Sequence, residues 1–191
     1  MYKLPFRIQK HILKRTALEY TKLKSNTHVI CLFPIAHTRF DEVMSIIKKY
    51  SNVFYHSSEV LNSRGQIGLI KEIYLKDGWA NEQGIQRKCD QCFMGKTNIT
   101  FVLVDAKDLE TVKEMKKKIR SLFNAGNHSV HINDTHEEAI RIAKTVFNDN
   151  SIRFLNNRKN ISFRNHRNLL NATKPDDNTV ITGSAVLSLY G

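Results

Sequence analysis

The chain has 191 residues, of which 41% are hydrophobic and 25% are charged, as is ordinary for a globular protein with a sizeable core. No apolar run approaches the length of a membrane span, and residues 1–25 lack the apolar core of a signal peptide, so we expect a cytoplasmic protein. Only three cysteines are present, an odd and small number that argues against a secreted disulfide framework.

The net charge of +12 is concentrated at the two ends of the chain. Residues 1–24 carry seven Lys or Arg against Glu19, and residues 153–174 carry six with no acid. These ends could bind nucleic acid or another polyanion. A solvated basic surface is the commoner interpretation, because no aromatic residues alternate with the charges in a stacking pattern.

The first half of the chain predicts a helix followed by two strand-helix pairs. Apolar residues at helical spacing predict an amphipathic helix over 7–23. The next predicted elements are a buried strand at 28–33, a helix with its apolar stripe from Phe40 to Ile47, a strand at 52–56 and a helix at 65–75.

The second half repeats this alternation after an irregular stretch, which we interpret as a loop holding the only tryptophan, Trp79. Helix N-caps are expected at Asp108 and at Asp134 or Thr135, and Thr135 with Glu138 has the spacing of a capping box. The expected elements are a loop at 78–95, a strand at 98–104, a helix at 109–122, a strand at 128–132, a helix through Ala139 to Phe147 and an extended segment at 151–155.

Strands that alternate with helices of about a dozen residues indicate an α/β fold with a mostly parallel sheet flanked by helices. A change to an Asn-, Arg- and Lys-rich composition predicts a boundary near residue 157. We therefore expect an α/β domain over 1–156, a basic linker or helix over 157–177 and a short C-terminal appendage over 178–191.

Cys89 and Cys92 form a single CxxC motif. A structural zinc site would need a second pair of ligands at suitable spacing, and a redox motif would lie between a strand and a helix. Neither context is evident, so ordinary thiols are the favoured interpretation and no metal site is predicted.

Polar residues follow several of the predicted strands. Because ligands bind beyond the carboxyl ends of strands in an open parallel sheet, we expect His37, Asp105 and Asp134 to meet at one rim as candidate catalytic residues. Helix capping is an alternative role for Asp134.

Arg120 is a candidate phosphate-binding residue, because it precedes the segment Gly126 to Ser129, whose backbone amides could bind an anion. Gly126 could equally be a helix C-cap. His128 and His131 would face opposite sides of a strand, which argues against a metal that they share.

The segment 178–191 contains an apolar strand, Gly183-Ser184 and the start of an apolar helix. This pattern resembles the first signature of the polymerase-β-like nucleotidyltransferase superfamily. Residues 98–156, centred on 128–138, resemble an α/β domain of bacterial and phage proteins fused to such a domain, a likeness that implies no reaction. The resemblance of residues 178–191 to the nucleotidyltransferase superfamily implies that Gly183 and Ser184 bind triphosphate oxygens.

In that superfamily a pair of carboxylates follows about a dozen residues later and holds two magnesium ions. No such pair follows Ser184 in the printed sequence, so this chain is not expected to transfer nucleotides alone, and magnesium is expected only for a complete domain. The resemblance implies a nucleotide or another phosphorylated ligand.

Three functional hypotheses follow. The first is the N-terminal α/β domain of a nucleotidyltransferase-like protein, with enzymatic activity only if the parent protein is complete. The second is a non-catalytic module that binds nucleic acid or another polyanion through its basic ends. The third is a small α/β enzyme that uses His37, Asp105 and Asp134. Substrate and oligomeric state do not follow from the sequence.

Overall fold

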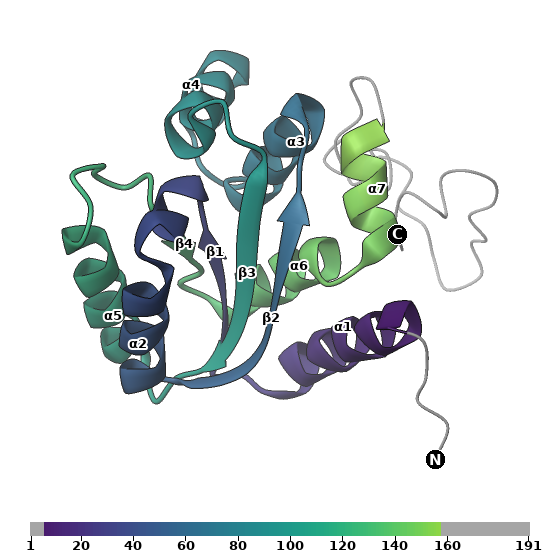
Figure 1. Cartoon of the computed structure of the whole chain (residues 1–191), viewed down its shortest axis with the longest axis vertical. Coiled ribbons are helices and arrows are strands. Elements are labelled where there is room, and N and C mark those ends of the chain that lie inside the picture. Colours follow the sequence, from purple (N-terminus) through teal and green to yellow (C-terminus); the bar gives the residue numbers. More distant parts are fainter. Residues whose placement is uncertain (1–5, 158–191) are drawn as a thin grey trace.

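A computed structural model describes residues 6–157 as a four-stranded sheet with helices on both faces (Figure 1). The strands are β1 (Thr27–Leu32), β2 (Asn52–Val60), β3 (Asn98–Asp105) and β4 (Val130–Ile132). The helices are α1 (Phe6–Leu23), the 3-10 helix η1 (Pro34–Arg39), α2 (Phe40–Tyr50), α3 (Ser63–Ile73), α4 (Glu82–Phe93), α5 (Leu109–Ser121), α6 (His136–Val146) and α7 (Asp149–Asn157).

The sheet is antiparallel, so the prediction of a mostly parallel sheet was wrong. The strand order is β2-β3-β1-β4, and each of the three neighbouring pairs is antiparallel. Helices do connect β1 to β2 and β3 to β4, and these connected strands run in the same direction. They are not neighbours in the sheet, because β3 lies between β1 and β2, and β1 lies between β3 and β4. This is the split β-α-β order of ferredoxin-like sheets, with α3 and α4 between β2 and β3.

Two further predictions of local structure were wrong. Residues 78–95 contain the helix α4 rather than only a loop, and Asn81 caps it by accepting a hydrogen bond from the Gly84 amide at 2.9 Å. Residues 151–155 lie in helix α7 rather than in an extended segment. In both segments buried side chains recur at helical spacing, as with Ile85 and Cys89 in α4.

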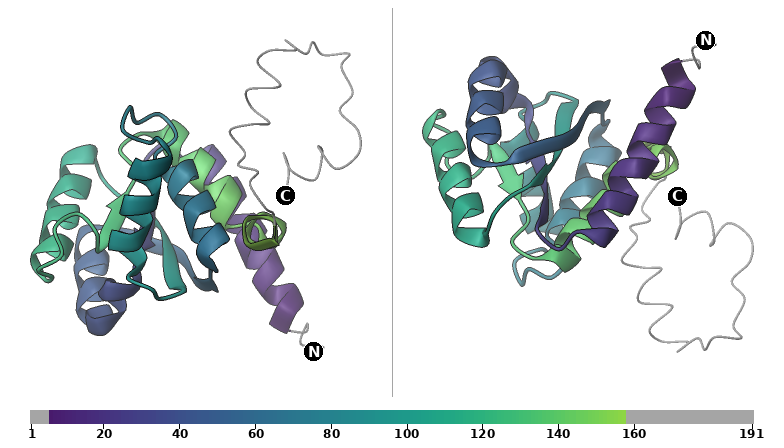
Figure 2. Two further views of the ribbon diagram at one scale, coloured as in Figure 1. Left: turned by 90° about the horizontal axis from the view of Figure 1, so that it is seen from above. Right: turned by 90° about the horizontal axis from the view of Figure 1, so that it is seen from below.

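Alternate residues of each central strand enter two separate cores. On one face, Ile30 and Val102 pack with α2 and α5. On the other face, Cys31 and Phe101 pack with α3, α4, α6 and α7. The sheet is therefore the middle layer of three, with α2 and α5 side by side on one face (Figure 2). Burial on both faces explains why β1 and β3 are rich in apolar residues without alternation, as buried parallel strands are.

The helix caps agree with the capping expectations. Asp108 accepts a hydrogen bond from the Thr111 amide at 2.8 Å and caps α5, whereas Thr135 accepts one from the Glu138 amide at 3.2 Å and caps α6. Asp134 is not the cap of α6. Among residues 6–157, no helix has the length and apolar character that a membrane crossing needs.

Candidate functional site

A cleft of about 750 Å³ opens beside β4 at the edge of the sheet. Its walls come from the segment between α3 and α4, from α4 itself, from α5, from β4 and from the start of α6. Four basic side chains line it, namely Arg87, Lys88, Lys116 and Arg120. We refer to this feature as the basic cleft.

The carboxylates of the basic cleft already have partners. Asp134 forms an ion pair with Lys116 at 2.9 Å, and Asp77 accepts a hydrogen bond from the Trp79 indole at 2.9 Å. Glu138 binds His131 at 3.1 Å. The other three cations of the cleft form no ion pair with an acid in the described part of the chain; they are Arg87, Lys88 and Arg120.

Arg120 and Lys88 are two such uncompensated cations. The Nε atom of Arg120 is buried and has no hydrogen-bond partner among the described residues. The Nζ of Lys88 lies 3.2 Å from the Asn127 carbonyl oxygen and 3.2 Å from His128 Nδ1, both uncharged acceptors when His128 is neutral. An anion between these cations would supply the missing charge.

Burial and mutual repulsion act together on these basic groups. Burial lowers the pKa of Lys88, and the positive charge of Arg120 lowers it further, although Cys92 acts in the opposite direction. Burial also lowers the pKa of His128, aided by the charges of Lys88 and Arg120. A bound anion would relieve this repulsion, so the electrostatics of the cleft favour a negatively charged ligand.

Tyr74, just after α3, contacts three other side chains that line the cleft. Its ring centre lies 4.8 Å from that of Trp79, 5.3 Å from that of His131 and 5.4 Å from Lys88 Nζ. These three side chains come from different parts of the chain. Their shared contact with one ring brings an aromatic surface, an imidazole and a cation together.

Trp79 is partly exposed but held in place. It keeps 41% of its surface exposed, while Asp77 fixes the indole nitrogen and Tyr74 supports the ring. A Cβ atom on Gly84 would lie only 2.2 Å from the Trp79 carbonyl oxygen and 3.2 Å from its ring. A fixed, accessible indole is suited to stacking against a planar ligand group.

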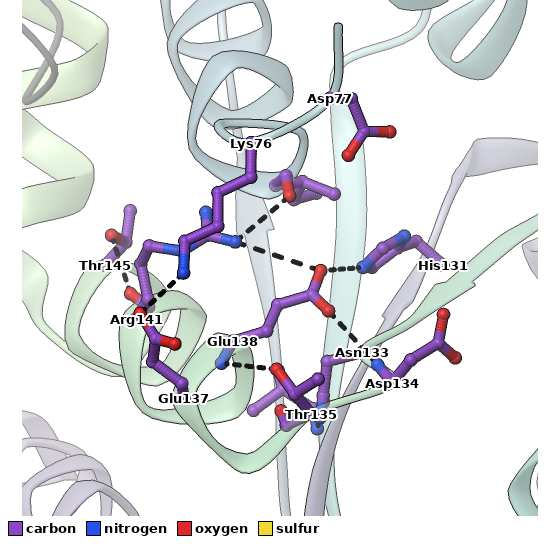
Figure 3. A network of polar contacts seen from close by, with 12 residues as sticks. Lys76, Asp77, His131, Asn133, Asp134, Thr135, Glu137, Glu138, Arg141 and Thr145 are labelled. Atoms are coloured by element: carbon purple, nitrogen blue, oxygen red, sulfur yellow. Dashed lines mark hydrogen bonds and ion pairs between the residues drawn. The ribbon is translucent and has the colours of Figure 1, made fainter.

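His131 and Glu138, which both line the cleft, belong to a network of polar contacts (Figure 3). The Oε2 atom of Glu138 accepts a hydrogen bond from the Asp134 amide at 3.1 Å. The Arg141 guanidinium lies 4.0 Å from Oε1, the atom that contacts His131. Burial raises the pKa of Glu138, but the hydrogen bond and charges around it give a net lowering. Glu138 is therefore an ionised acceptor.

The three predicted catalytic residues do not meet. Because β1 and β3 are antiparallel, the residues that follow them lie at opposite ends of the sheet, with Thr27 opposite Asp105 and Leu32 opposite Thr100. His37 binds Asn98 and Thr100 near the start of β3.

At the other end of the sheet, Asp105 accepts a hydrogen bond from the Tyr20 hydroxyl at 3.1 Å and another from Asn26. Asp134 lines the basic cleft with Arg120, the predicted phosphate-binding residue. Gly183 and Ser184, together with the expected appendage at 178–191 and all but the first residue of the expected linker at 157–177, lie outside the described residues.

The two cysteines of the CxxC motif are buried in the core beneath α4. Burial raises the pKa of Cys89 to about 12 and that of Cys92 to about 11, so both thiols stay protonated at neutral pH. No group of three or more His, Cys, Asp or Glu side chains within residues 6–157 is arranged to hold a metal ion.

The sequence interpretation missed most of the basic cleft. Arg87, Lys88 and Trp79 lie in or just before α4, the helix that was interpreted as a loop. The capping residue Asn81, followed by Ile85, Cys89 and Cys92 at helical spacing, is the signal that could have identified this helix. Glu138 was considered only as part of a capping box.

Comparisons with known proteins leave the family open. The chain matches no protein-family model and no curated protein. Among solved structures it is similar to the nucleoside diphosphate kinase of Aquifex aeolicus, with 12% identity over 61% of this chain and 90% of that one, at a TM-score of 0.42. A likeness of this size carries no information about ligand or activity.

Proposed function

We propose that the described domain binds a nucleotide in the basic cleft. The phosphates contact Arg120, Lys88 and Arg87, and the base stacks against Trp79. The observation that carries the proposal is the half-buried Arg120, whose Nε has no hydrogen-bond partner and whose charge has no counter-ion within residues 6–157, beside Lys88. The proposal includes a cytoplasmic location.

The charge and the aromatic surface each favour this class of ligand. Phosphate oxygens can accept several hydrogen bonds from a guanidinium and a nearby ammonium group. A simple inorganic anion would use the cations and leave the exposed indole without a role. A nucleotide uses both, because its planar base can stack while its phosphates bind the cations.

Binding can be measured by the fluorescence of Trp79, which is the only tryptophan in the chain. ATP, ADP and pyrophosphate are titrated against the full chain, and calorimetry supplies independent dissociation constants. We expect quenching by the nucleotides and weaker binding of pyrophosphate, which has no base.

Arg120→Gln tests the phosphate contact, with Lys117→Gln as a matched control of equal charge change on the exposed side of α5. Loss of a charge-assisted contact predicts about 10- to 100-fold weaker ATP binding for Arg120→Gln and little change for the control. Equal weakening by both variants would contradict a specific site. So would the absence of nucleotide binding.

The second hypothesis, a polyanion-binding module that uses the basic ends, predicts a different result. Nucleic acid would then bind with a steep salt dependence, and Arg120→Gln would leave that binding almost unchanged. The proposal that the parent protein is nucleotidyltransferase-like rests on Gly183 and Ser184, and an assay of nucleotide transfer with magnesium tests it.

A further inference from the structure

We propose that the basic cleft also hydrolyses the nucleotide, with His131 as the general base that activates a water molecule for attack on a phosphoanhydride bond. The inference rests on the proposed nucleotide site and adds an activity to it. It starts from the orientation that Glu138 imposes on the imidazole of His131 (Figure 3).

The ionised carboxylate of Glu138 fixes the tautomer of His131. It lies 3.1 Å from His131 Nε2 and can only accept a hydrogen bond, so Nε2 carries the proton. In the neutral ring, Nδ1 then holds the lone pair. A carboxylate that orients an imidazole in this way is a recurring arrangement for a histidine that removes a proton.

Nδ1 of His131 is free to take that proton. It makes no hydrogen bond with any residue in the range 6–157, and the side chain lines the basic cleft. His37 shows the contrast, because both of its ring nitrogens are engaged, by Asn98 and by Thr100. His131 lines the same cleft as the cations that would hold the phosphates.

Groups from every neighbouring element set the protonation of His131. Burial lowers its pKa most strongly. Against burial, the hydrogen bond and charge of Glu138 raise the pKa, Asp134 raises it slightly, and Lys116 on α5 lowers it. Tyr74 contacts the ring edge, and Cys31 lies opposite on β1. The net shift is downward, so the imidazole is neutral at neutral pH.

Water is the only reactant besides the nucleotide in the proposed hydrolysis. The water oxygen forms a bond to the terminal phosphorus while one of its protons moves to His131 Nδ1. The bridging P–O bond breaks, and its electron pair stays on the diphosphate that leaves. Arg120, Lys88 and Arg87 offset the charge on this leaving group. The imidazolium then releases its proton to solvent, and the products are a nucleoside diphosphate and inorganic phosphate.

Release of inorganic phosphate from ATP and GTP by the full chain, with magnesium chloride present, tests the inference. His131→Gln should lower the rate by about 100- to 10,000-fold, which is the usual contribution of a general base. ATP binding to this variant, followed by Trp79 fluorescence, should stay within about threefold, because the phosphate contacts are intact. His56→Gln, on the exposed surface of the opposite edge strand β2, is the matched control and should keep the wild-type rate.

The pH profile separates catalysis from a structural role. The wild-type rate should rise with pH and reach half of its maximum below the ordinary histidine value of 6.5, because the base must be unprotonated. Glu138→Gln keeps an acceptor for Nε2 but removes the charge that raises the pKa of His131. Its half-maximum should therefore move to lower pH, with a reduced maximal rate.

Each outcome decides one point. ATP that binds without any phosphate release would overturn the inference and leave nucleotide binding intact, whereas failure to bind ATP would remove the proposed function itself. A His131→Gln variant that binds ATP and hydrolyses it at the wild-type rate would also overturn the inference. An unchanged pH profile in Glu138→Gln would refute the orienting role of that carboxylate.

Discussion

Gly84 is the single residue on which the position of Trp79 depends most directly. It occupies the first turn of α4, and its amide donates to the capping Asn81 side chain at 2.9 Å. A side chain at this position would collide with the Trp79 backbone. The close approach therefore requires glycine here, although glycine is a poor helix former.

Gly84→Ala should destabilise the protein even though alanine favours helices. Helix propensity alone predicts a gain of up to about 1 kcal/mol, but a Cβ atom 2.2 Å from the Trp79 carbonyl oxygen predicts a net loss of about 1–3 kcal/mol. Urea unfolding measures this loss, and Trp79 fluorescence reports the accompanying movement. Gly78→Ala is the control, because no atom lies within 4 Å of its added Cβ. Equal effects of the two substitutions would contradict the close contact.

Some site residues could be predicted from the sequence and others could not. Arg120 was identified from its place before a glycine-containing turn, and it does line the cleft. His131 was considered only with His128 as a shared metal site. Its actual partner, Glu138, lies on the next helix, and their contact depends on how α6 returns to the edge of the sheet. Sequence spacing does not contain that tertiary information.

The sequence predicts the individual strands and helices better than it predicts how the strands pair. Short apolar runs bounded by polar or turn residues located all four strands, because such runs depend on which segments are buried. The direction of pairing depends on which strands become neighbours. The run from Ile99 to Val104 is buried on both faces, and both antiparallel and parallel sheets accept such a strand when helices cover both sides.

The packing of α7 on α3 depends on a close approach at two glycines. A Cβ atom on Gly65 would lie 2.2 Å from Asn156 Oδ1, and one on Gly68 would lie 2.7 Å from Leu155 Cδ2. Asn156 also donates to the Val60 carbonyl oxygen at 3.0 Å and accepts from the Asn62 amide at 3.0 Å. These contacts connect α7 to the end of β2 as well as to α3.

This packing predicts a coupled pair of substitutions. Gly68→Ala should cost about 1–3 kcal/mol through overpacking against the buried Leu155. In a Leu155→Ala background the same change should become neutral or stabilising, because the obstructing methyl groups are gone and alanine favours the helix. A double-mutant cycle of urea unfolding free energies measures the coupling. Additive effects would show that α7 does not pack tightly on Gly68.

Buried charged and titratable groups connect the layers of the fold and make its stability depend on pH. Lys14 on α1 is almost fully buried and pairs with Glu59 on β2 at 2.7 Å and with Asp149 on α7 at 2.5 Å. Burial raises the pKa of Asp149, but the hydrogen bond and charge of Lys14 outweigh it, and the net shift is downward. Stability from this contact is lost as pH falls below the ordinary value of 3.8 and through the lowered pKa.

An earlier loss of stability on acidification should come from the buried histidines. Burial is the first cause of the lowered pKa of both His28 and His131, so the folded state keeps them neutral at a pH where the unfolded chain protonates them. The unfolded state therefore binds more protons once the pH drops below 6.5, and the free energy of unfolding falls until the lowered pKa values are reached. Each such histidine contributes a slope of about 1.4 kcal/mol per pH unit within this range.

Urea unfolding between pH 7 and about pH 5 should show this slope in the free energy of unfolding. His131→Gln should remove the part of this slope that comes from one histidine, whereas His56→Gln, at an exposed position, should leave the slope unchanged. A stability that stays constant across this range would mean that the two imidazoles can be protonated inside the fold.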